Sequence, residues 1–261
     1  MELNGTSAIV TGAASGLGEA TARALAQAGA HVVVADVNEE RGKEVAADIG
    51  GQFAKTDVTD EESVREAVSA AATAGRPLRV AVSCAGIGWA ERTVSRDGKP
   101  HGLASFQKVI AVNLTGTFNL MRLAAAAIAQ TDPADSDGQR GVIVNTSSIA
   151  GIEGQTGQLA YSASKGGIIG MTVPAARDLS VIGVRVNTIC PGVMHTPIYK
   201  SIAGTGRDAE EFLARLAAPV VFPKRLGRPE EFGHLVRVLV ENDYMNAEVV
   251  RFDGGIRFQP K

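Results

Sequence analysis

TGAASGLG, residues 11–18, separates an apolar run from a stretch with helical spacing. The residues before it, SAIV, are mostly β-branched or small, and the segment from Gly16 to Gly29 repeats alanine and leucine at helical intervals. Gly12, Gly16 and Gly18 permit turn conformations and close approach of the backbone. Free amide groups and the helix dipole both favour negative charge at a helix N-terminus, so this strand, turn and helix predict a phosphate site.

A second apolar run, HVVVAD, ends at Asp36, eighteen residues after Gly18. A carboxylate at this place accepts hydrogen bonds from a ribose 2′-hydroxyl and repels a 2′-phosphate. Turn glycines and a strand-end aspartate also occur for purely structural reasons. The order of strand, glycine turn, helix, strand and acid nevertheless favours a dinucleotide site, and it predicts NAD as the cofactor.

The same alternation continues along the chain. Strand-like runs cover residues 6–12, 31–36, 52–58, 78–84, 141–148, 184–190 and 247–255. Helical patterns cover residues 16–29, 60–75, 114–130, 164–180 and 229–240. Repeated alternation predicts an α/β fold, a Rossmann-like doubly wound parallel sheet of seven strands with helices on both faces. No linker or repeat divides residues 1–261, so we expect one domain.

Composition narrows the function further. A net charge of −2 and a pI near 6.1 give no reason to expect nucleic acid as a partner. No apolar run reaches the ~18 residues needed to span a membrane, and no signal-peptide pattern opens the sequence, so we expect a cytoplasmic protein without a membrane partner. Cys84 and Cys190 are expected to be free thiols, and the four histidines show no pairing typical of a metal site.

The segment YSASK, residues 161–165, places a phenol and an ammonium four residues apart. On a helix these positions share one face, so Tyr161 and Lys165 can meet across a single turn. Such a pair also occurs on ordinary exposed helical faces. Its meaning depends on the rest of the sequence.

Together these features resemble the classical short-chain dehydrogenases/reductases over essentially the whole chain. Residues 11–18 match the family's glycine motif, TGxxxGxG. The serine is assigned as Ser148, not Ser147, because the family's serine lies thirteen residues before the tyrosine. The resemblance implies four catalytic residues, which are Asn113, Ser148, Tyr161 and Lys165.

The resemblance also implies a set of cofactor contacts. Ser83-Cys84-Ala85-Gly86 stands where most members have Asn-Asn-Ala-Gly, a departure that leaves the backbone of Ala85 and Gly86 usable as contacts. The implied NAD-binding residues are Gly12, Ser15, Gly16, Leu17, Gly18, Asp36, Asp57, Val58, Cys84, Ala85, Gly86, Tyr161, Lys165, Pro191, Gly192, Val193 and Thr196.

The chemistry of a ketone explains the pair of residues at 161 and 165. When it accepts a hydride, the oxygen becomes alkoxide-like and needs a proton donor within hydrogen-bond reach. Tyr161 would be that acid, and the base in reverse, with the positive charge of Lys165 favouring the phenolate. The resemblance further implies that Lys165 binds the nicotinamide ribose, Ser148 holds the substrate oxygen, and Asn113 anchors a water in a proton relay.

Within the family, the insertion at residues 93–109 and the C-terminal end resemble the type II 3-hydroxyacyl-CoA dehydrogenases. This predicts an NAD-dependent oxidoreductase that interconverts a short or branched 3-hydroxyacyl-CoA and the 3-oxoacyl-CoA. Arg96, Lys99, Lys200 and Arg207 could attract the phosphates of coenzyme A, although each could equally be a solvated surface residue. The alternatives are activity on hydroxysteroids or 3-oxoacyl-carrier protein, or a catalytically silent nucleotide-binding subunit.

The remaining expectations concern the substrate side and assembly. Ser148, Gln155 and Tyr161 are expected to bind substrate, although Gln155 could instead face water. A substrate loop is expected at about residues 193–223, where apolar side chains would form a lid or pack the loop down; they are Met194, Ile198, Tyr199, Phe212 and Leu213. The resemblance implies a homotetramer, with helices near 103–130 and 158–181 at one interface.

Overall fold

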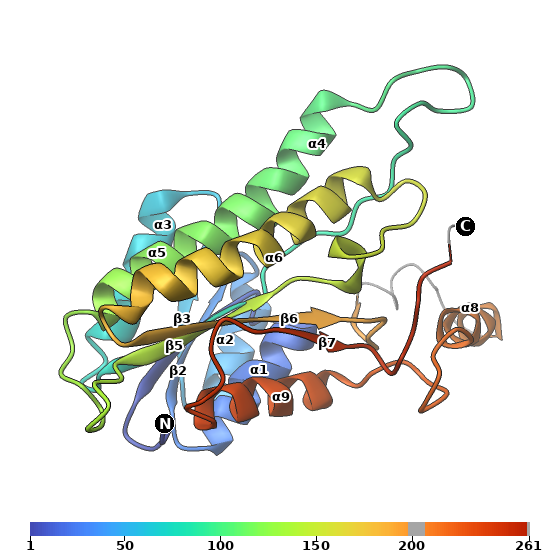
Figure 1. Cartoon of the computed structure of the whole chain (residues 1–261). Helices are drawn as coiled ribbons and strands as arrows, with labels where there is room; N and C mark the ends of the chain where they lie inside the picture. The colour runs from blue at the N-terminus through green and yellow to red at the C-terminus, as the bar shows by residue number, and fades with distance from the viewer. Residues whose placement is uncertain (198–206, 260–261) are drawn as a thin grey trace.

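Seven parallel strands form one sheet in the order β3-β2-β1-β4-β5-β6-β7 (Figure 1). The computed structural model describes residues 1–197 and 207–259. The strands are β1 (Ser7–Thr11), β2 (His31–Asp36), β3 (Gln52–Lys55), β4 (Leu78–Ser83), β5 (Gly141–Thr146), β6 (Val184–Pro191) and β7 (Val249–Phe252). Every predicted strand is present, and the doubly wound parallel sheet expected from the alternation is confirmed.

Helices link the strands. They are α1 (Gly16–Gln27), α2 (Glu39–Asp48), α3 (Glu61–Ala72), α4 (Leu103–Ile110), α5 (Gly116–Ile128), α6 (Leu159–Ser180), α8 (Arg207–Ala217) and α9 (Pro229–Glu241), with a π-helical turn η1 (Ala111–Thr115) and a 3₁₀ turn η2 (Ile149–Gly151). The helical patterns did not predict α2 or α8, and α6 begins before its predicted start at residue 164.

The helices cover the sheet in two layers (Figure 1). One apolar core lies between the sheet and α1, α2 and α9, and it includes Leu25, Val45 and Phe232. A second core lies on the opposite face between the sheet and α3, α5 and α6, and it includes Val64 and Leu120. Because both faces are covered, the central strands are apolar on both sides, as the sequence runs predicted.

The strand order creates a crevice beside β1. The chain passes from β1 through β2 to β3, and then returns to form β4 on the other side of β1. At such a switch point the connections after the two central strands diverge, and ligands of doubly wound sheets bind outside the carboxyl ends of these strands. The glycine turn after β1 therefore faces the segment after β4.

A long apolar helical segment, Leu103–Ile128, combines α4, η1 and α5. Within the described part of the chain it alone is long and apolar enough to cross a membrane, but half of its most apolar window is buried inside the protein. Leu120, Leu123 and Ile128 pack into the core against the sheet. We therefore interpret the segment as a core helix of this fold.

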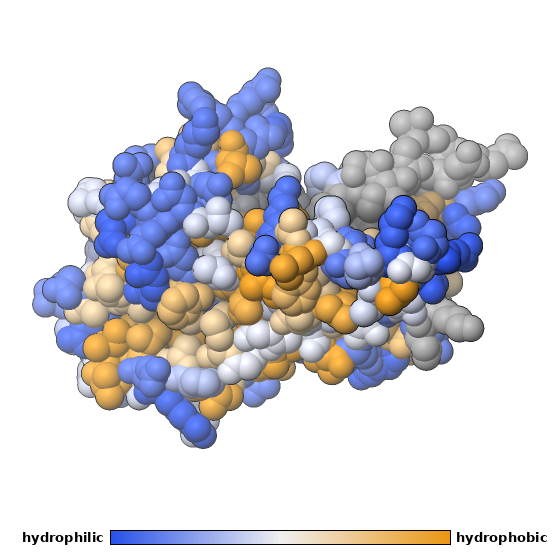
Figure 2. All heavy atoms as spheres, turned by 90° about the horizontal axis from the view of Figure 1, so that it is seen from above, coloured by the Kyte–Doolittle hydropathy of each residue, from blue (hydrophilic) through white to orange (hydrophobic). Residues whose placement is uncertain are grey.

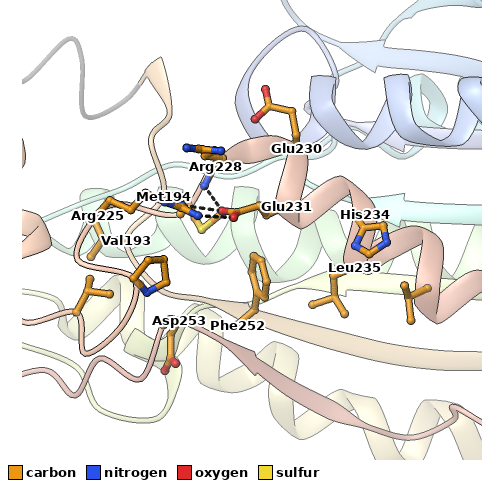
Figure 3. Close-up of a pocket in the computed structure, with 15 residues that line it drawn as sticks. Val193, Met194, Arg225, Arg228, Glu230, Glu231, His234, Leu235, Phe252 and Asp253 are labelled. Carbon is orange, nitrogen blue, oxygen red and sulfur yellow. Dashed lines mark hydrogen bonds and ion pairs between the residues drawn. The ribbon is translucent and has the colours of Figure 1, made fainter.

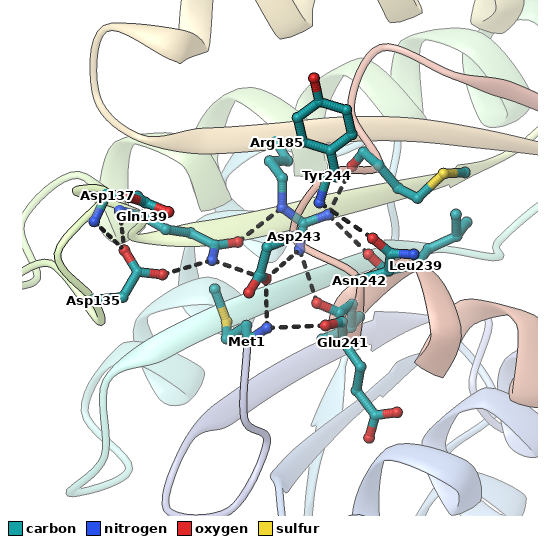
Figure 4. Close-up of polar contacts among 12 residues, drawn as sticks. Met1, Asp135, Asp137, Gln139, Arg185, Leu239, Glu241, Asn242, Asp243 and Tyr244 are labelled. Atoms are coloured by element: carbon teal, nitrogen blue, oxygen red, sulfur yellow. Dashed lines mark hydrogen bonds and ion pairs between the residues drawn. The ribbon is translucent and has the colours of Figure 1, made fainter.

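Arg185 on β6 joins the sheet to the end of α9 (Figure 4). Its guanidinium donates to the carbonyl oxygens of Leu239, Val240 and Met245, each at 2.8 Å, and to Gln139 Oε1 at 2.8 Å. The carbonyls at the end of α9 lack partners within the helix, and a cation there complements the helix dipole. Burial lowers the pKa of Arg185. Arg185 lies at the start of β6, so it fixes α9 against the sheet at the amino ends of the strands, whereas the crevice lies at their carboxyl ends.

Candidate active site

The glycine turn has a geometry that side chains larger than hydrogen would prevent. Gly12 and Gly16 have φ values of 66° and 56°, in the left-handed region. A Cβ on Gly18 would lie 2.1 Å from the carbonyl oxygen of Gly12, and a Cβ on Gly12 would lie 2.7 Å from the amide nitrogen of Ala85. The turn therefore packs directly against the end of β4, and its bare backbone lines the crevice.

Asp36 is placed at the edge of this turn. Its Oδ2 accepts from the amide of Ala14 at 2.9 Å, and its Oδ1 accepts from the amide of Asn38 at 2.9 Å. Each oxygen keeps a second lone pair, so the carboxylate both fastens the turn and retains acceptor capacity. This position is the one that an acid reading a ribose hydroxyl would occupy.

Other predicted cofactor residues lie around the same crevice. Ser15 is the exposed N-cap residue of α1, while Leu17 packs toward the core. Asp57 is exposed beyond β3, and its Oδ1 accepts from the amide and the hydroxyl of Thr59. Val58 is buried against α5. Backbone and small side chains thus form most of the surface here.

The end of β6 closes the crevice from another side. The amide of Gly192, which follows Pro191, donates to the carbonyl of Phe252 at 2.9 Å, and Val193 is buried beneath it. The methyl group of Thr196 lies near Gly16, since a Cβ on that glycine would be 3.5 Å from it. The structure therefore places this threonine at the N-terminus of α1, beside the glycine turn.

Asn113 lies fully buried in the π-helical turn η1. Its Oδ1 accepts from the amide of Ile87 at 2.8 Å, and its Nδ2 donates to the carbonyl of Ile87 at 3.0 Å and to Ser164 Oγ at 3.1 Å. Ser164 Oγ in turn donates to the carbonyl of Tyr161 at 2.7 Å. One side chain thus connects the segment after β4 to the first turns of α6. π-Turns often occur at functional sites.

The two neighbouring serines have different surroundings. Ser147 Oγ donates to the carbonyl of Lys165 at 2.7 Å, so its hydroxyl holds the backbone of α6. Ser148 Oγ caps η2 by accepting from the amide of Ala150 at 3.1 Å, which leaves its proton for an acceptor in the site. This difference agrees with the choice of Ser148 from spacing.

Tyr161 and Lys165 lie on adjacent turns of α6, with Lys165 Nζ 5.8 Å from the centre of the phenol ring. Lys165 is only 5% exposed, and its Nζ donates to the carbonyl of Thr146 at 2.9 Å. Burial lowers the pKa of Lys165 to about 8. At neutral pH the side chain is still mainly an ammonium, and it brings a positive charge close to the phenol.

Cys84 and Gly86 define the segment after β4. Cys84 Sγ lies 3.5 Å from Thr146 Oγ1, and burial raises the pKa of this thiol to about 11, so the thiol stays protonated at neutral pH. A Cβ on Gly86 would lie 3.2 Å from Asn113 Oδ1 and 3.6 Å from Lys165 Nζ. The neutral thiol of Cys84 therefore packs against Thr146, whereas the backbone of Gly86 lies close to Asn113 and Lys165.

Sequence reasoning missed two residues of this site. Ser164 bridges Asn113 and Tyr161, and the carbonyl of Thr146 holds Lys165. Both are adjacent to motif residues, in YSASK and in NTSS. The serine three residues after Tyr161 was a possible signal in the sequence. The carbonyl of Thr146 belongs to the backbone, so no residue type could have indicated its role.

The residues predicted for the substrate side lie in the loop before α6, in the loop after β6 and in the insertion. Gln155 Nε2 donates to the carbonyl of Gln259 at 3.2 Å, so its amide is turned toward the C-terminal segment. The predicted substrate loop contains helix α8, whose Leu213 packs into a small apolar cluster. Ile198, Tyr199 and Lys200 lie outside the described residues, as does the side chain of Arg207. Lys99 pairs with Asp97 at 2.7 Å.

Two cavities lie beside the site. One of about 730 Å³ lies between α9, β7 and the loop after β6, and its lining combines apolar side chains such as Leu235 and Phe252 with the ion pair of Arg225 and Glu231 (Figure 3). It does not include the catalytic candidates. Another, of about 540 Å³, lies between the insertion and the loop before α6, where Gln155 contributes to its wall. Within residues 1–197 and 207–259 no three histidine, cysteine or acidic side chains gather as a metal site would require.

Comparison with known proteins gives a consistent result. A sequence profile of the short chain dehydrogenases matches residues 6–205. The 3-hydroxyacyl-CoA dehydrogenase type-2 of Homo sapiens is 48% identical over 261 residues, covering 99% of this chain and 97% of that protein. Its Drosophila melanogaster counterpart is 45% identical and covers 97% of each. The crystal structure of 3-hydroxyacyl-CoA dehydrogenase type-2 from Mycobacterium avium is 49% identical, with a TM-score of 0.92 over all of both chains.

Proposed function

Because this chain belongs to the short-chain dehydrogenase family, we propose that it interconverts 3-hydroxyacyl-CoA and 3-oxoacyl-CoA thioesters with NAD. The observation that carries the substrate class is the near-full-length similarity to 3-hydroxyacyl-CoA dehydrogenase type-2 from several animals. The arrangement of the buried residues Asn113, Ser148 and Lys165 with the half-buried Tyr161 at the crevice supports the chemistry.

The crevice suits a dinucleotide. Gly12 and Gly18 let the turn pack closely against the end of β4 and the start of α1, where a Cβ would clash, and the amides at the start of α1 would bind a pyrophosphate. Asp36 would accept from the adenine-side ribose, and Lys165 would donate to the nicotinamide ribose. When bound, NAD supplies the acceptor for hydride, and NADH supplies the hydride.

The protein residues control the proton. Ser148 would donate to the carbonyl oxygen of the substrate, and this fixes the oxygen beside Tyr161. The phenol of Tyr161 would give its proton to that oxygen as negative charge develops on it, and it would take the proton back in the oxidative direction. The ammonium of Lys165 lies close enough to favour the phenolate. Asn113 would hold α6 and the segment after β4 in register.

The cofactor choice can be tested directly. Asp36 would meet the 2′-phosphate of NADPH with like charge, so we expect kcat/KM to favour NADH at least about tenfold. Asp36→Asn should narrow this ratio. Equal efficiency with the two cofactors in the wild-type protein would defeat the assignment.

The substrate class needs a three-way comparison. Acetoacetyl-CoA, its truncated pantetheine thioester and a steroid ketone should be assayed with NADH at two salt concentrations. We expect acetoacetyl-CoA to be reduced most efficiently and its advantage over the truncated ester to shrink at high salt, because exposed charges attract its phosphates. A steroid turned over far more efficiently would overturn the CoA assignment but leave the dehydrogenase assignment intact. NADH binding without turnover of any carbonyl would instead indicate a silent nucleotide-binding subunit.

We also propose a homotetramer that works in the cytoplasm. The face seen in Figure 2, above the view of Figure 1, carries hydrophobic residues between polar rims. Leu103, Phe118, Leu159 and Val173 on α4, α5 and α6 are each more than a third exposed. Exposed apolar residues grouped on one face support an interface there. Light scattering of the wild-type protein and of Phe118→Glu would test it, since the charge should dissociate one interface.

A further inference from the structure

The C-terminal strap, defined as residues 253–259, lies against two parts of the substrate side. On one side the carbonyl of Gly254 accepts from the amides of Val221 and Phe222, both at 3.1 Å, in the segment that follows α8. On the other side the strap contacts the pre-helix loop, defined as residues 152–158, which connects η2 to α6. The strap thus joins two segments that approach the site from opposite directions.

An ion pair joins the end of β7 to the pre-helix loop, and the same arginine binds the strap. Arg251 Nη2 donates to Glu153 Oε1 at 2.7 Å and to the carbonyl of Ile256 at 3.0 Å, and its Nε donates to Asp253 Oδ2 at 2.8 Å. The side chain of Asp253 is only 8% exposed, and its Oδ2 pairs with Arg251 at 2.6 Å and with Arg257 at 3.4 Å. Arg251 also lowers the pKa of Glu153. One guanidinium therefore holds the end of β7, the strap and the loop together.

Two further contacts tie the same segments. Gln155 Nε2 donates to the carbonyl of Gln259 at 3.2 Å, and the amide of Phe258 donates to Glu153 Oε1 at 3.4 Å. Ile256 is fully buried, and Phe258 packs beside it in an apolar cluster with Ile149. Because Ile149 directly follows Ser148, the strap packs against the segment that carries this serine.

The pre-helix loop in turn packs tightly against the catalytic helix. A Cβ on Gly154, within the loop, would lie 2.2 Å from Ser162 Oγ, and a Cβ on Gly151, at the end of η2 just before the loop, would lie 2.8 Å from the carbonyl carbon of Lys165. At these two glycines the backbone lies in direct contact with the first turns of α6. Displacement of Glu153 would therefore change the relative positions of Ser148 and Tyr161.

We propose that Glu153 is a positioning residue, through which the C-terminal strap holds Ser148 and Tyr161 at the separation that proton transfer requires. This inference rests on the proposed function for its kinetic consequence. Glu153 touches neither the reacting oxygen nor the cofactor crevice; its carboxylate is committed to Arg251 and the amide of Phe258.

The test uses the full chain with Glu153→Gln. Its matched control is Glu241→Gln, which breaks another 2.7 Å pair, with Arg237, at the end of α9. We expect Glu153→Gln to lower kcat for acetoacetyl-CoA about tenfold, since small misplacements of reacting groups have large effects on rate. The dissociation constant for NADH should stay within about twofold of wild type, because the glycine turn is untouched. Amide hydrogen exchange should rise together in residues 149–158 and 253–259, and Glu241→Gln should show neither change.

Each result decides a separate claim. If amide hydrogen exchange is unchanged in Glu153→Gln, the strap does not hold the pre-helix loop through Glu153. If exchange rises but kcat is unchanged, Glu153 does not position the catalytic residues. If Glu153→Gln loses NADH affinity as much as it loses kcat, or if Glu241→Gln loses as much kcat as Glu153→Gln does, the effect is a general loss of structure. Either result would overturn the proposal. A wild-type protein that fails to reduce acetoacetyl-CoA would defeat the proposed function, and the exchange experiment would still decide whether the strap holds the loop.

Discussion

Replacing Asn113 with alanine should weaken both folding and catalysis. The side chain is fully buried and makes three hydrogen bonds, of 2.8, 3.0 and 3.1 Å, to the amide and carbonyl of Ile87 and to Ser164 Oγ. Ser164 keeps its bond to the carbonyl of Tyr161, so the substitution leaves mainly the two backbone groups of Ile87 without partners. An unsatisfied buried group costs about 1–3 kcal/mol, so we expect the free energy of unfolding to fall by about 3 kcal/mol.

The kinetic effect follows from what Asn113 connects. Without it, the segment that includes Gly86 and the first turns of α6 lose their common anchor, and kcat should fall at least about tenfold. Urea unfolding gives the change in stability, and NADH-dependent reduction of acetoacetyl-CoA gives kcat. Asn119→Ala, on α5, is the control. Asn119 Nδ2 donates to the carbonyls of Val58 and Asp60 at 3.3 and 3.5 Å, and its Oδ1 accepts from Arg122 Nη2 at 2.8 Å.

The control should lose no more than about 1 kcal/mol of stability and should keep its kcat, since its contacts lie away from the catalytic residues. If Asn113→Ala unfolds at the same urea concentration as the wild type, the hydrogen bonds described here do not hold the site together. If it is destabilised but turns over normally, Asn113 is structural only.

Three further predictions concern single residues. Tyr161→Phe should lower kcat at least about 100-fold with NADH affinity nearly unchanged, because only the proton donor is lost; retained turnover would place the acid elsewhere. Arg185→Met should reduce the free energy of unfolding by about 3 kcal/mol or more in urea titrations, because it leaves the buried carbonyls at the end of α9 without their donor; an unchanged midpoint would contradict this. Burial lowers the pKa of Lys165 from 10.5 to about 8, so between these values the unfolded chain carries a proton that the folded chain has released. The stability of the wild type relative to Lys165→Met should therefore rise with pH through this window in urea unfolding, and a constant difference would refute the shift.

Local patterns were enough to predict the sheet and the glycine turn that follows its first strand. The seven strands are short apolar runs whose burial on both faces follows from the alternation with helices, and Gly12, Gly18 and Asp36 lie where strand ends require them. The catalytic positions came from resemblance, and the family's spacing of thirteen residues before the tyrosine selected Ser148 over Ser147. The hydrogen bonds of the two serines now distinguish them.

Other features depend on contacts that local patterns do not contain. Helix α2 is largely charged and exposed, so its apolar periodicity is weak; it is fixed by the Asn38 cap and by Gly42, where a Cβ would lie 2.2 Å from the ring of Phe53. The pair of Glu153 and Arg251 joins residues 98 positions apart. Such a contact arises only when the strands and the C-terminal strap are already in place, and no single segment encodes it.

The π-helical turn η1 sets the angle at which α4 leaves the body of the protein. A π-turn contains one residue more than the corresponding α-helical turn, and each residue of a helix corresponds to about 100° of rotation. Deleting one residue from Ala111–Thr115 would therefore not merely shorten the helix but swing α4, and the insertion before it, around the helix axis. The number of residues in this turn therefore determines the direction in which the insertion points. Relatives that differ by one residue here would present a different wall to the substrate while keeping the same sheet.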